Sequence, residues 1–270
     1  MNKAVSLLKW IAAILVIAYS GICVYFYYIQ DQIIFRPSAL PQDYTYSYDF
    51  PYEERYFFVN EEVKIHAIHA RTENPKGLVL YFHGNRGSNN TNPDKFELFL
   101  TRGYDVLYPD YRSFGKSSGE LTNGEDLVAD MKVVYREMMK EYEQDQIIVL
   151  GYSLGSGFAA QVAASFDPKS IVIWTPYLSM IDMKDAVYPF LPDFLVRFPL
   201  RTDEALQQIE EPVYIFYAEE DEVLPVKRSI RLNDYLKESD KYFILKRQGH
   251  GRIYRNNDLL NEMSVILGSE

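Results

Sequence analysis

Residues 147–155 read IIVLGYSLG, and this stretch decides the fold. The apolar run 147–150 is typical of a buried strand, and the motif GYSLG (residues 151–155) follows it directly, opening a small-residue helical pattern over residues 154–166. In this strand–turn–helix context the two glycines permit a tight turn that exposes the serine between them. We therefore predict that Ser153 is a nucleophile. A serine here could also cap the helix, but capping would not explain both glycines.

Strand and helix patterns alternate on both sides of this motif. β-rich runs predict strands at residues 55–60, 63–71, 77–82, 104–109, 147–150, 171–174, 213–217 and 242–245. Helical patterns occupy residues 94–102, 124–143, 154–166, about 226–238 and the segment from about 252 onward. This alternation predicts an α/β fold in which helices cover both faces of a mostly parallel sheet.

The alternation breaks at residues 178–211, where two predicted strands are separated by more chain than one crossover needs. We predict a cap insertion here. Its apolar residues could receive an acyl chain, or they could pack onto the core. These residues are Leu178, Met180, Met183, Val187, Tyr188, Phe190, Leu191, Phe194, Leu195 and Phe198.

A serine nucleophile needs a base, and the chain has four histidines. His66 and His69 fall within an early strand pattern that accounts for them, and His83 ends a buried strand before the elbow. His250 follows the last strand on a glycine-flanked loop. The order serine, acid, histidine favours His250 as the base, although it could also be an exposed loop residue.

The acid should follow a strand that lies between the serine and the histidine in the chain. The segment AEEDEVLP (residues 218–225) offers four carboxylates after such a strand: Glu219, Glu220, Asp221 and Glu222. Their spacing to Pro225 favours Asp221, and Asp182 is the reserve. The same carboxylates could equally form a solvated turn.

The amino-terminal segment has the composition of a membrane anchor. Residues 10–29 form an uncharged run long enough to span about 30 Å as a helix, with Trp10 at one end and tyrosines at the other. Lys3 and Lys9 precede this run, so the positive-inside rule places the amino terminus in the cytoplasm and the rest of the chain in the periplasm, lumen or extracellular space. A signal peptide cleaved after Ser20, or a buried helix, are the alternatives.

These patterns divide the chain into an anchor (residues 1–29), an extended arm rich in Tyr and Pro (residues 30–54) and a catalytic domain (residues 55–270) that carries the cap. The composition, with 47% hydrophobic and 24% charged residues, excludes disorder. A net charge of −10 argues against nucleic-acid binding. The single cysteine and the absence of metal-binding spacings predict neither a disulfide within the chain nor a metal or other cofactor.

The motifs together resemble those of the α/β-hydrolase superfamily over about residues 30–267, and particularly its membrane-anchored abhydrolase-domain branch. QDQIIFRP (residues 30–37) is similar to the arm that follows the anchor in that branch. HGN (residues 83–85) is similar to its oxyanion loop and DYRSFGKS (residues 110–117) to its D-Y-R-G-Y-G-x-S segment. AEEDEVLP is similar to its G-x-x-D-x-x-V-P segment.

This resemblance implies that the backbone N–H groups of Asn85 and Leu154 hold the oxyanion. Three residues depart from the branch pattern: Arg86 replaces a small residue, and Ser113 and Ala218 replace glycines. None of these departures removes a reacting group.

The resemblance and the motifs predict a membrane-anchored serine hydrolase that cleaves ester or thioester bonds through an acyl-enzyme, with Ser153, His250 and Asp221 as its triad. Its partners would be a small acyl-ester or acyl-thioester, including a lipid or an acylated protein, and the membrane through residues 10–29. A serine peptidase of the prolyl-aminopeptidase type and a catalytically idle membrane-tethered binding domain are the alternatives.

Overall fold

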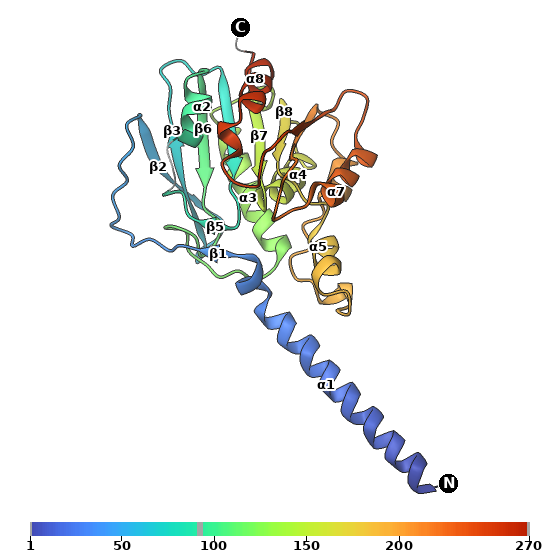
Figure 1. The fold of residues 1–270 in the computed structure, drawn as a ribbon. Helices are drawn as coiled ribbons and strands as arrows, with labels where there is room; N and C mark the ends of the chain where they lie inside the picture. The colour runs from blue at the N-terminus through green and yellow to red at the C-terminus, as the bar shows by residue number, and fades with distance from the viewer. Residues whose placement is uncertain (1, 91–93, 269–270) are drawn as a thin grey trace.

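A computed structural model of the chain describes residues 2–90 and 94–268, so the outermost residues of the predicted anchor and catalytic domain lie outside it. Within the described residues an eight-stranded sheet has the order β10-β9-β8-β7-β4-β6-β3-β2 (Figure 1). Its strands are β2 (Tyr52–Phe58), β3 (Lys64–Ala70), β4 (Gly77–Phe82), β6 (Tyr104–Pro109), β7 (Ile147–Tyr152), β8 (Ser170–Trp174), β9 (Val213–Ala218) and β10 (Lys241–Leu245).

The sheet is mostly parallel, as predicted. β3 pairs antiparallel with both β2 and β6, whereas the strands from β6 through β4, β7, β8 and β9 to β10 are parallel. The carboxyl ends of these parallel strands therefore meet at one edge. Ligands of open α/β sheets bind outside that edge, which also lies towards the long amino-terminal helix in Figure 1.

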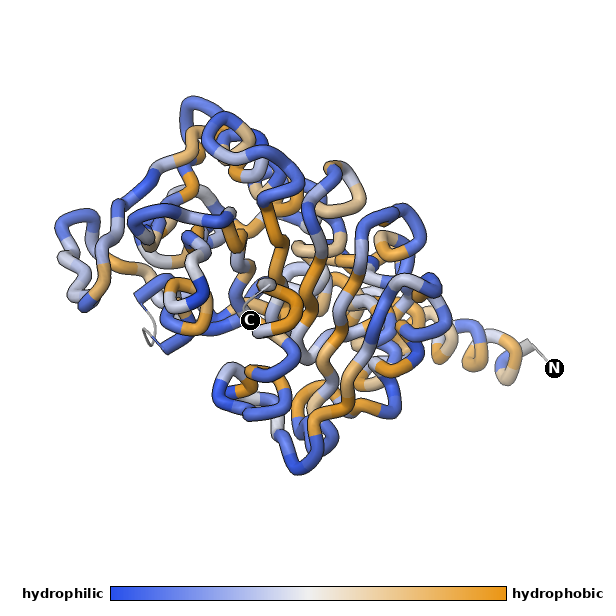
Figure 2. The backbone as a smooth tube through the Cα atoms, turned by 90° about the horizontal axis from the view of Figure 1, so that it is seen from above, coloured by the Kyte–Doolittle hydropathy of each residue, from blue (hydrophilic) through white to orange (hydrophobic). Residues whose placement is uncertain are grey.

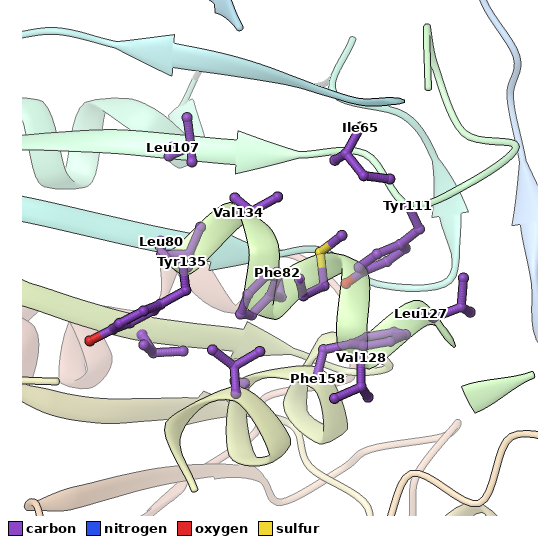
Figure 3. Close-up of a cluster of buried hydrophobic side chains, with 14 of the residues drawn as sticks. Ile65, Leu80, Phe82, Leu107, Tyr111, Leu127, Val128, Val134, Tyr135 and Phe158 are labelled. Atoms are coloured by element: carbon purple, nitrogen blue, oxygen red, sulfur yellow. The ribbon is translucent and has the colours of Figure 1, made fainter. Parts of the chain in front are cut away.

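Helices cover both faces of the sheet because side chains alternate along each strand. Leu80 and Phe82 of β4 pack with α3 (Gly124–Met138) and α4 (Gly155–Ala163), where Val134 and Phe158 point towards them (Figure 3). The opposite face packs against α2 (Asp94–Leu100) and α8 (Asn257–Ile266). Figure 2 shows the hydrophobic segments gathered inside the domain and hydrophilic loops outside.

The first helix, α1 (Asn2–Ile34), projects away from the domain (Figure 1). It is long and apolar enough to cross a membrane, and its most apolar stretch is not buried within the protein. The helix ends at Ile34 and β2 begins at Tyr52, so the extended segment is shorter at both ends than the predicted arm over residues 30–54. The helix continues past residue 29 because Gln30 and Ile34 contact the domain, where the Gln30 amide donates to the Leu195 carbonyl.

The arm lies on the domain, as its aromatic composition suggests. Its short strand β1 (Arg36–Pro37) pairs in parallel with β5 (Arg86–Gly87). Farther along, Tyr46 is buried, and its hydroxyl donates to the Asn89 side chain at 2.5 Å. The arm therefore connects α1 to the loop that follows β4.

The insertion between β8 and β9 contains α5 (Met180–Val187), the 3₁₀ helix η2 (Asp193–Leu195) and α6 (Thr202–Leu206). The segment predicted as one helix over about 226–238 instead forms α7 (Val226–Ser229) and the 3₁₀ helix η3 (Ile230–Tyr235). Side-chain bonds hold this segment to neighbouring elements, with Arg228 bonded to Asp182 and Asn233 to Tyr217. Two further 3₁₀ helices are η4 (Ile253–Arg255), which precedes α8, and η1 (Gln144–Gln146), which precedes β7.

The two buried histidines of β3 predict a pH-dependent stability. Desolvation by burial lowers the pKa of His66 and of His69 to about 4. Unfolded histidines titrate near 6.5, so below that pH the unfolded chain binds protons that the folded chain does not. We expect lowering the pH from 7 to 5 to reduce the free energy of unfolding by about 2 kcal/mol per histidine.

Unfolding in detergent at both pH values measures this effect. His69→Gln should reduce the difference between the two pH values, even if it lowers stability at each of them. If the change in the free energy of unfolding between pH 7 and pH 5 were the same in His69→Gln, burial of His69 would not be its cause.

Candidate active site

Ser153 sits in the tight turn between β7 and α4. Its φ angle is +53°, in the left-handed region that non-glycine residues rarely occupy. A Cβ atom on Gly151 would lie 2.4 Å from the Gly155 carbonyl oxygen, and one on Gly155 would lie 2.1 Å from the Phe82 carbonyl oxygen. Both positions therefore need glycine, and the turn has the shape that the GYSLG motif predicts.

His250 reaches Ser153 from the loop after β10. Its Nε2 lies 2.9 Å from the Ser153 Oγ, and its Nδ1 lies 2.8 Å from Asp221 Oδ2. With the proton on Nδ1, the imidazole donates to the carboxylate and accepts from the serine hydroxyl. The three side chains thus form one chain of hydrogen bonds across the carboxyl ends of β7, β9 and β10.

The backbone fixes Asp221 in place. Its Oδ1 accepts from the N–H groups of Val223 at 2.9 Å and Leu224 at 2.6 Å, which leaves Oδ2 for His250. Glu222 supports the histidine loop differently, because its carboxylate accepts from the His250 backbone N–H at 3.0 Å. This hydrogen bond lowers the pKa of Glu222 below its ordinary value.

The other candidate carboxylates face elsewhere. Glu219 accepts from the Arg247 backbone N–H at 3.0 Å. Asp182 lies in the first turn of α5 and pairs with Arg228 at 2.9 Å and Arg231 at 2.8 Å. Among the described carboxylates of this region, Asp221 is the one bonded to the His250 imidazole.

The loop after β4 brings Asn85 beside the serine. A Cβ on Gly84 would lie 3.6 Å from the Ser153 Cβ, within van der Waals contact, so this backbone lies next to the elbow. The backbone N–H groups of Asn85 and Leu154 donate to no other described residue. Asn85 and Leu154 also line the same cavity as Ser153.

The end of α1 and the start of the arm hold this loop. The Asn85 side chain donates to the Ile34 carbonyl at 2.9 Å, and the Arg36 N–H donates to the Asn85 carbonyl at 2.7 Å. Ser38 and Gly87 add another backbone bond of 2.8 Å. The position of Asn85 therefore depends on the segment that joins the helix to the domain.

The remaining histidines lie away from the serine hydroxyl. His83 is buried, with its Nδ1 2.7 Å from the Gly84 carbonyl oxygen and its Nε2 3.4 Å from Asp110 Oδ1. His66 contacts Glu54 and Asn89, and His69 contacts Tyr142. These three histidines therefore support the domain and the loop after β4.

The departures from the family pattern leave the triad untouched. Arg86 is exposed and does not line the cavity. Ser113 has a φ of +67°, a conformation that glycine adopts without steric cost. Ala218 ends β9 as a buried residue.

A cavity of about 250 Å³ lies over Ser153. Its walls come from the last turns of α1, the loop after β4, the elbow, the cap and the segment after Asp221, and they are mostly apolar. The lining residues are Phe26, Gln30, Ile33, Ile34, Asn85, Ser153, Leu154, Tyr177, Met180, Met183, Lys184, Val187, Tyr188, Leu191, Pro192, Leu195, Val196, Val223 and Leu224.

The predicted cap residues divide into three groups. Six of the ten line the cavity: Met180, Met183, Val187, Tyr188, Leu191 and Leu195. Leu178 and Phe198 are buried in the core, whereas Phe190 and Phe194 are exposed. Six cap side chains thus lie where a bound group would contact them, two pack onto the core, and two do neither.

The wall formed by α1 is the part of the site that sequence reasoning missed. Phe26, Ile33 and Ile34 lie in or next to a run in which nearly every residue is apolar, so no periodic pattern marks the face that contacts the cavity. Gln30 is the polar residue among those of α1 that line the cavity. A glutamine directly after an apolar run suggests a specific hydrogen-bond partner, and this residue could have indicated the contact.

Nothing in the described residues suggests a metal site. Within residues 2–90 and 94–268, no three His, Cys, Asp or Glu side chains lie close enough together to hold a metal ion.

Known proteins resemble this chain in sequence and in fold. The family model described as "Serine aminopeptidase, S33" matches residues 73–203. An uncharacterized protein of Mycobacterium tuberculosis is 24% identical over 247 residues, covering 89% of this chain and 87% of that protein. A lysophosphatidylserine lipase of Danio rerio is 25% identical over 185 residues, covering 60% of this chain and 48% of the lipase.

A solved structure extends the likeness to almost the whole domain. The esterase of Pyrococcus furiosus superposes with a TM-score of 0.70 at 19% sequence identity, covering 87% of this chain and 97% of the esterase. At this level of identity the likeness shows a common fold.

Proposed function

Because the chain belongs to the α/β-hydrolase superfamily, in its abhydrolase-domain branch, we propose that it is a membrane-anchored serine hydrolase that cleaves ester or thioester bonds through an acyl-enzyme. The observation that carries this proposal is the chain of hydrogen bonds from Ser153 through His250 to Asp221 beneath an apolar cavity. The names of the lipase and esterase relatives agree with an ester substrate.

In the proposed mechanism Ser153 Oγ attacks the substrate carbonyl while His250 Nε2 takes the hydroxyl proton. Asp221 holds the imidazole in the required tautomer and stabilises the imidazolium. The Asn85 and Leu154 N–H groups stabilise the oxyanion, helped by the positive end of the α4 dipole. His250 then protonates the leaving group, and a water activated by the same imidazole releases the acyl group.

We place the catalytic domain outside the cytoplasm, anchored by α1. Lys3 and Lys9 before the apolar run support this orientation. The contacts of α1 with the domain support retention of the helix over cleavage after Ser20, because Tyr19 donates to the Phe190 carbonyl at 2.8 Å. Removal of residues 1–20 would break that contact.

The cavity favours acyl groups over peptides with a free amino terminus. An aminopeptidase must bind an α-ammonium group, usually with a carboxylate. The charged residue among those that line the cavity is Lys184, and no Asp or Glu of the described chain lines it. The intact hydrogen bonding of the triad also argues against an idle binding domain.

A panel of p-nitrophenyl esters of increasing chain length, given to the full-length protein in detergent, tests the proposal. We expect kcat/KM to rise about fourfold with each added methylene while the chain fills the apolar cavity, and then to fall. Met183→Phe should move the optimum to shorter chains and Met183→Ala to longer ones, since Met183 lines the cavity. Prolyl p-nitroanilide should not be cleaved; its cleavage in preference to the esters would support the peptidase.

A further inference from the structure

One face of α1 packs against the cap. Tyr19, Cys23, Phe26, Gln30 and Ile34 follow each other at three- and four-residue spacing, so they share that face. The Gln30 side chain donates to the Leu195 carbonyl and accepts from the Arg197 N–H, both at 2.8 Å. The ring of Phe26 lies 4.7 Å from that of Tyr188. The cap is thus joined to the helix over several turns.

These contacts place the end of the cap beside the apolar part of α1. The helix carries no charged residue between Lys9 and Asp31. Phe26 lies five residues before Asp31, about 7–8 Å along the axis towards the apolar run. The contact from Tyr19 to the Phe190 carbonyl involves a residue still deeper in the run. A bilayer that surrounds this run therefore meets the cap as well.

We call residues 187–194 the cap tip, and its surface is apolar. Phe194 is 83% exposed, Val187 59% and Phe190 51%. The one charged residue of this segment, Asp193, is exposed and lies 2.5 Å from Lys184 Nζ, an ammonium that it shares with Asp185. The surface of a soluble protein rarely gathers large apolar side chains in this way. Because these side chains lie beside α1, the lipid that surrounds the helix could cover them.

We propose that the cap tip inserts into the bilayer leaflet that faces the catalytic domain, and forms a second membrane contact beside α1. The inference rests on the proposed anchoring by α1. An insertion of about 5–10 Å is usual for interfacial elements with an apolar face, and it agrees with the level of Phe26 on the helix. The contacting partner is the lipid itself, because the tip is continuous with the lipid-facing surface of α1.

The insertion also defines the route of the substrate. Val187 and Ile33 line the cavity and are also exposed, by 59% and 38%, so the cavity reaches the surface between the cap tip and α1. With the tip inserted, this opening faces the acyl region of the leaflet. A chain resident in the bilayer then enters the cavity without crossing water.

Spin labels on the full-length protein in phosphatidylcholine vesicles test the insertion. In a Cys23→Ala background, labels are placed one at a time at Phe194→Cys, Ile14→Cys and Val265→Cys. Ile14 is 62% exposed in the middle of α1, and Val265 is 73% exposed on α8, at the opposite end of the domain (Figure 1). Collision with oxygen, which partitions into lipid, is compared with collision with a water-soluble nickel chelate.

We expect the ratio of oxygen to nickel collisions at position 194 to resemble that at 14 and to exceed that at 265 several-fold. If the collision ratio at position 194 resembles that at position 265, while position 14 is embedded in lipid, the cap tip lies in water. The inference is then wrong, although anchoring by α1 stands. If 14 also resembles 265, anchoring fails, and the insertion fails with it. Protection of 194 from both reagents would indicate a protein partner or a second copy, and would also overturn the inference.

A kinetic comparison adds a readout that does not depend on labels. Phe194→Ser should slow hydrolysis of a long-chain ester embedded in vesicles, and leave hydrolysis of p-nitrophenyl acetate in water unchanged, because Phe194 does not line the cavity. Phe194→Leu should keep both rates. Equal rates of Phe194→Ser and the unaltered protein on vesicles would contradict the inserted tip.

Discussion

Ser153→Ala is expected to lower kcat for ester hydrolysis by about 10⁶-fold, which is the loss measured when a serine protease loses its nucleophile. No other described hydroxyl lies within bonding distance of the His250 Nε2. Removal of the Ser153 hydroxyl therefore leaves the imidazole without a side-chain nucleophile to activate. The oxyanion donors remain in this variant and would give only a small residual rate.

Ser156→Ala is the matched control for this change. Ser156 is buried in the first turn of α4, and its hydroxyl donates to the Ser153 carbonyl at 2.7 Å. This hydroxyl has no part in the proposed chemistry, so most of the activity should remain. Ester hydrolysis by Ser153→Ala at a rate close to that of Ser156→Ala would refute the assignment of the nucleophile.

Asp221→Asn should reduce kcat by about 10⁴-fold while the fold stays intact. An asparagine Oδ1 can still accept from the Val223 and Leu224 N–H groups, which preserves the turn. Its Nδ2 would face His250 Nδ1 with a donor, so the imidazole could no longer keep its proton on Nδ1. The histidine would then lose the tautomer in which Nε2 accepts the serine proton.

Asp182→Asn is the control for the acid. This residue pairs with Arg228 and Arg231 on the cap side, so its loss should alter stability a little and kcat far less than Asp221→Asn. Kinetics and circular dichroism of both variants separate the two roles. If Asp182→Asn abolished ester hydrolysis while Asp221→Asn kept it, Asp221 would not be the acid of the triad.

Much of the sheet could be predicted because each strand is marked locally. Runs such as residues 77–82 and 147–150 are short, apolar and bounded by turn residues. The GYSLG motif carries its own geometry, since a Cβ at Gly151 or Gly155 would collide with backbone atoms. Elimination among four histidines then pointed to His250, which lies 2.9 Å from the Ser153 Oγ.

Features that depend on tertiary contacts could not be predicted in this way. In α1 almost every residue is apolar, so the face towards the cap, with Phe26 and Ile34, carries no periodic signal. In the cap, Met183 and Phe194 are similar in hydropathy, yet one lines the cavity and the other is exposed. The difference depends on how the cap folds over the domain, which the hydropathy of a single residue does not show.

Covalent labelling tests the central claim, that Ser153 forms an acyl-enzyme, most directly. The full-length protein is treated with a fluorophosphonate probe, its intact mass is measured, and the labelled peptide is sequenced. The account predicts a single adduct, on Ser153, which is absent from Ser153→Ala and forms far more slowly in His250→Ala. An adduct that persists in Ser153→Ala, or that lies on any other residue, would contradict the account.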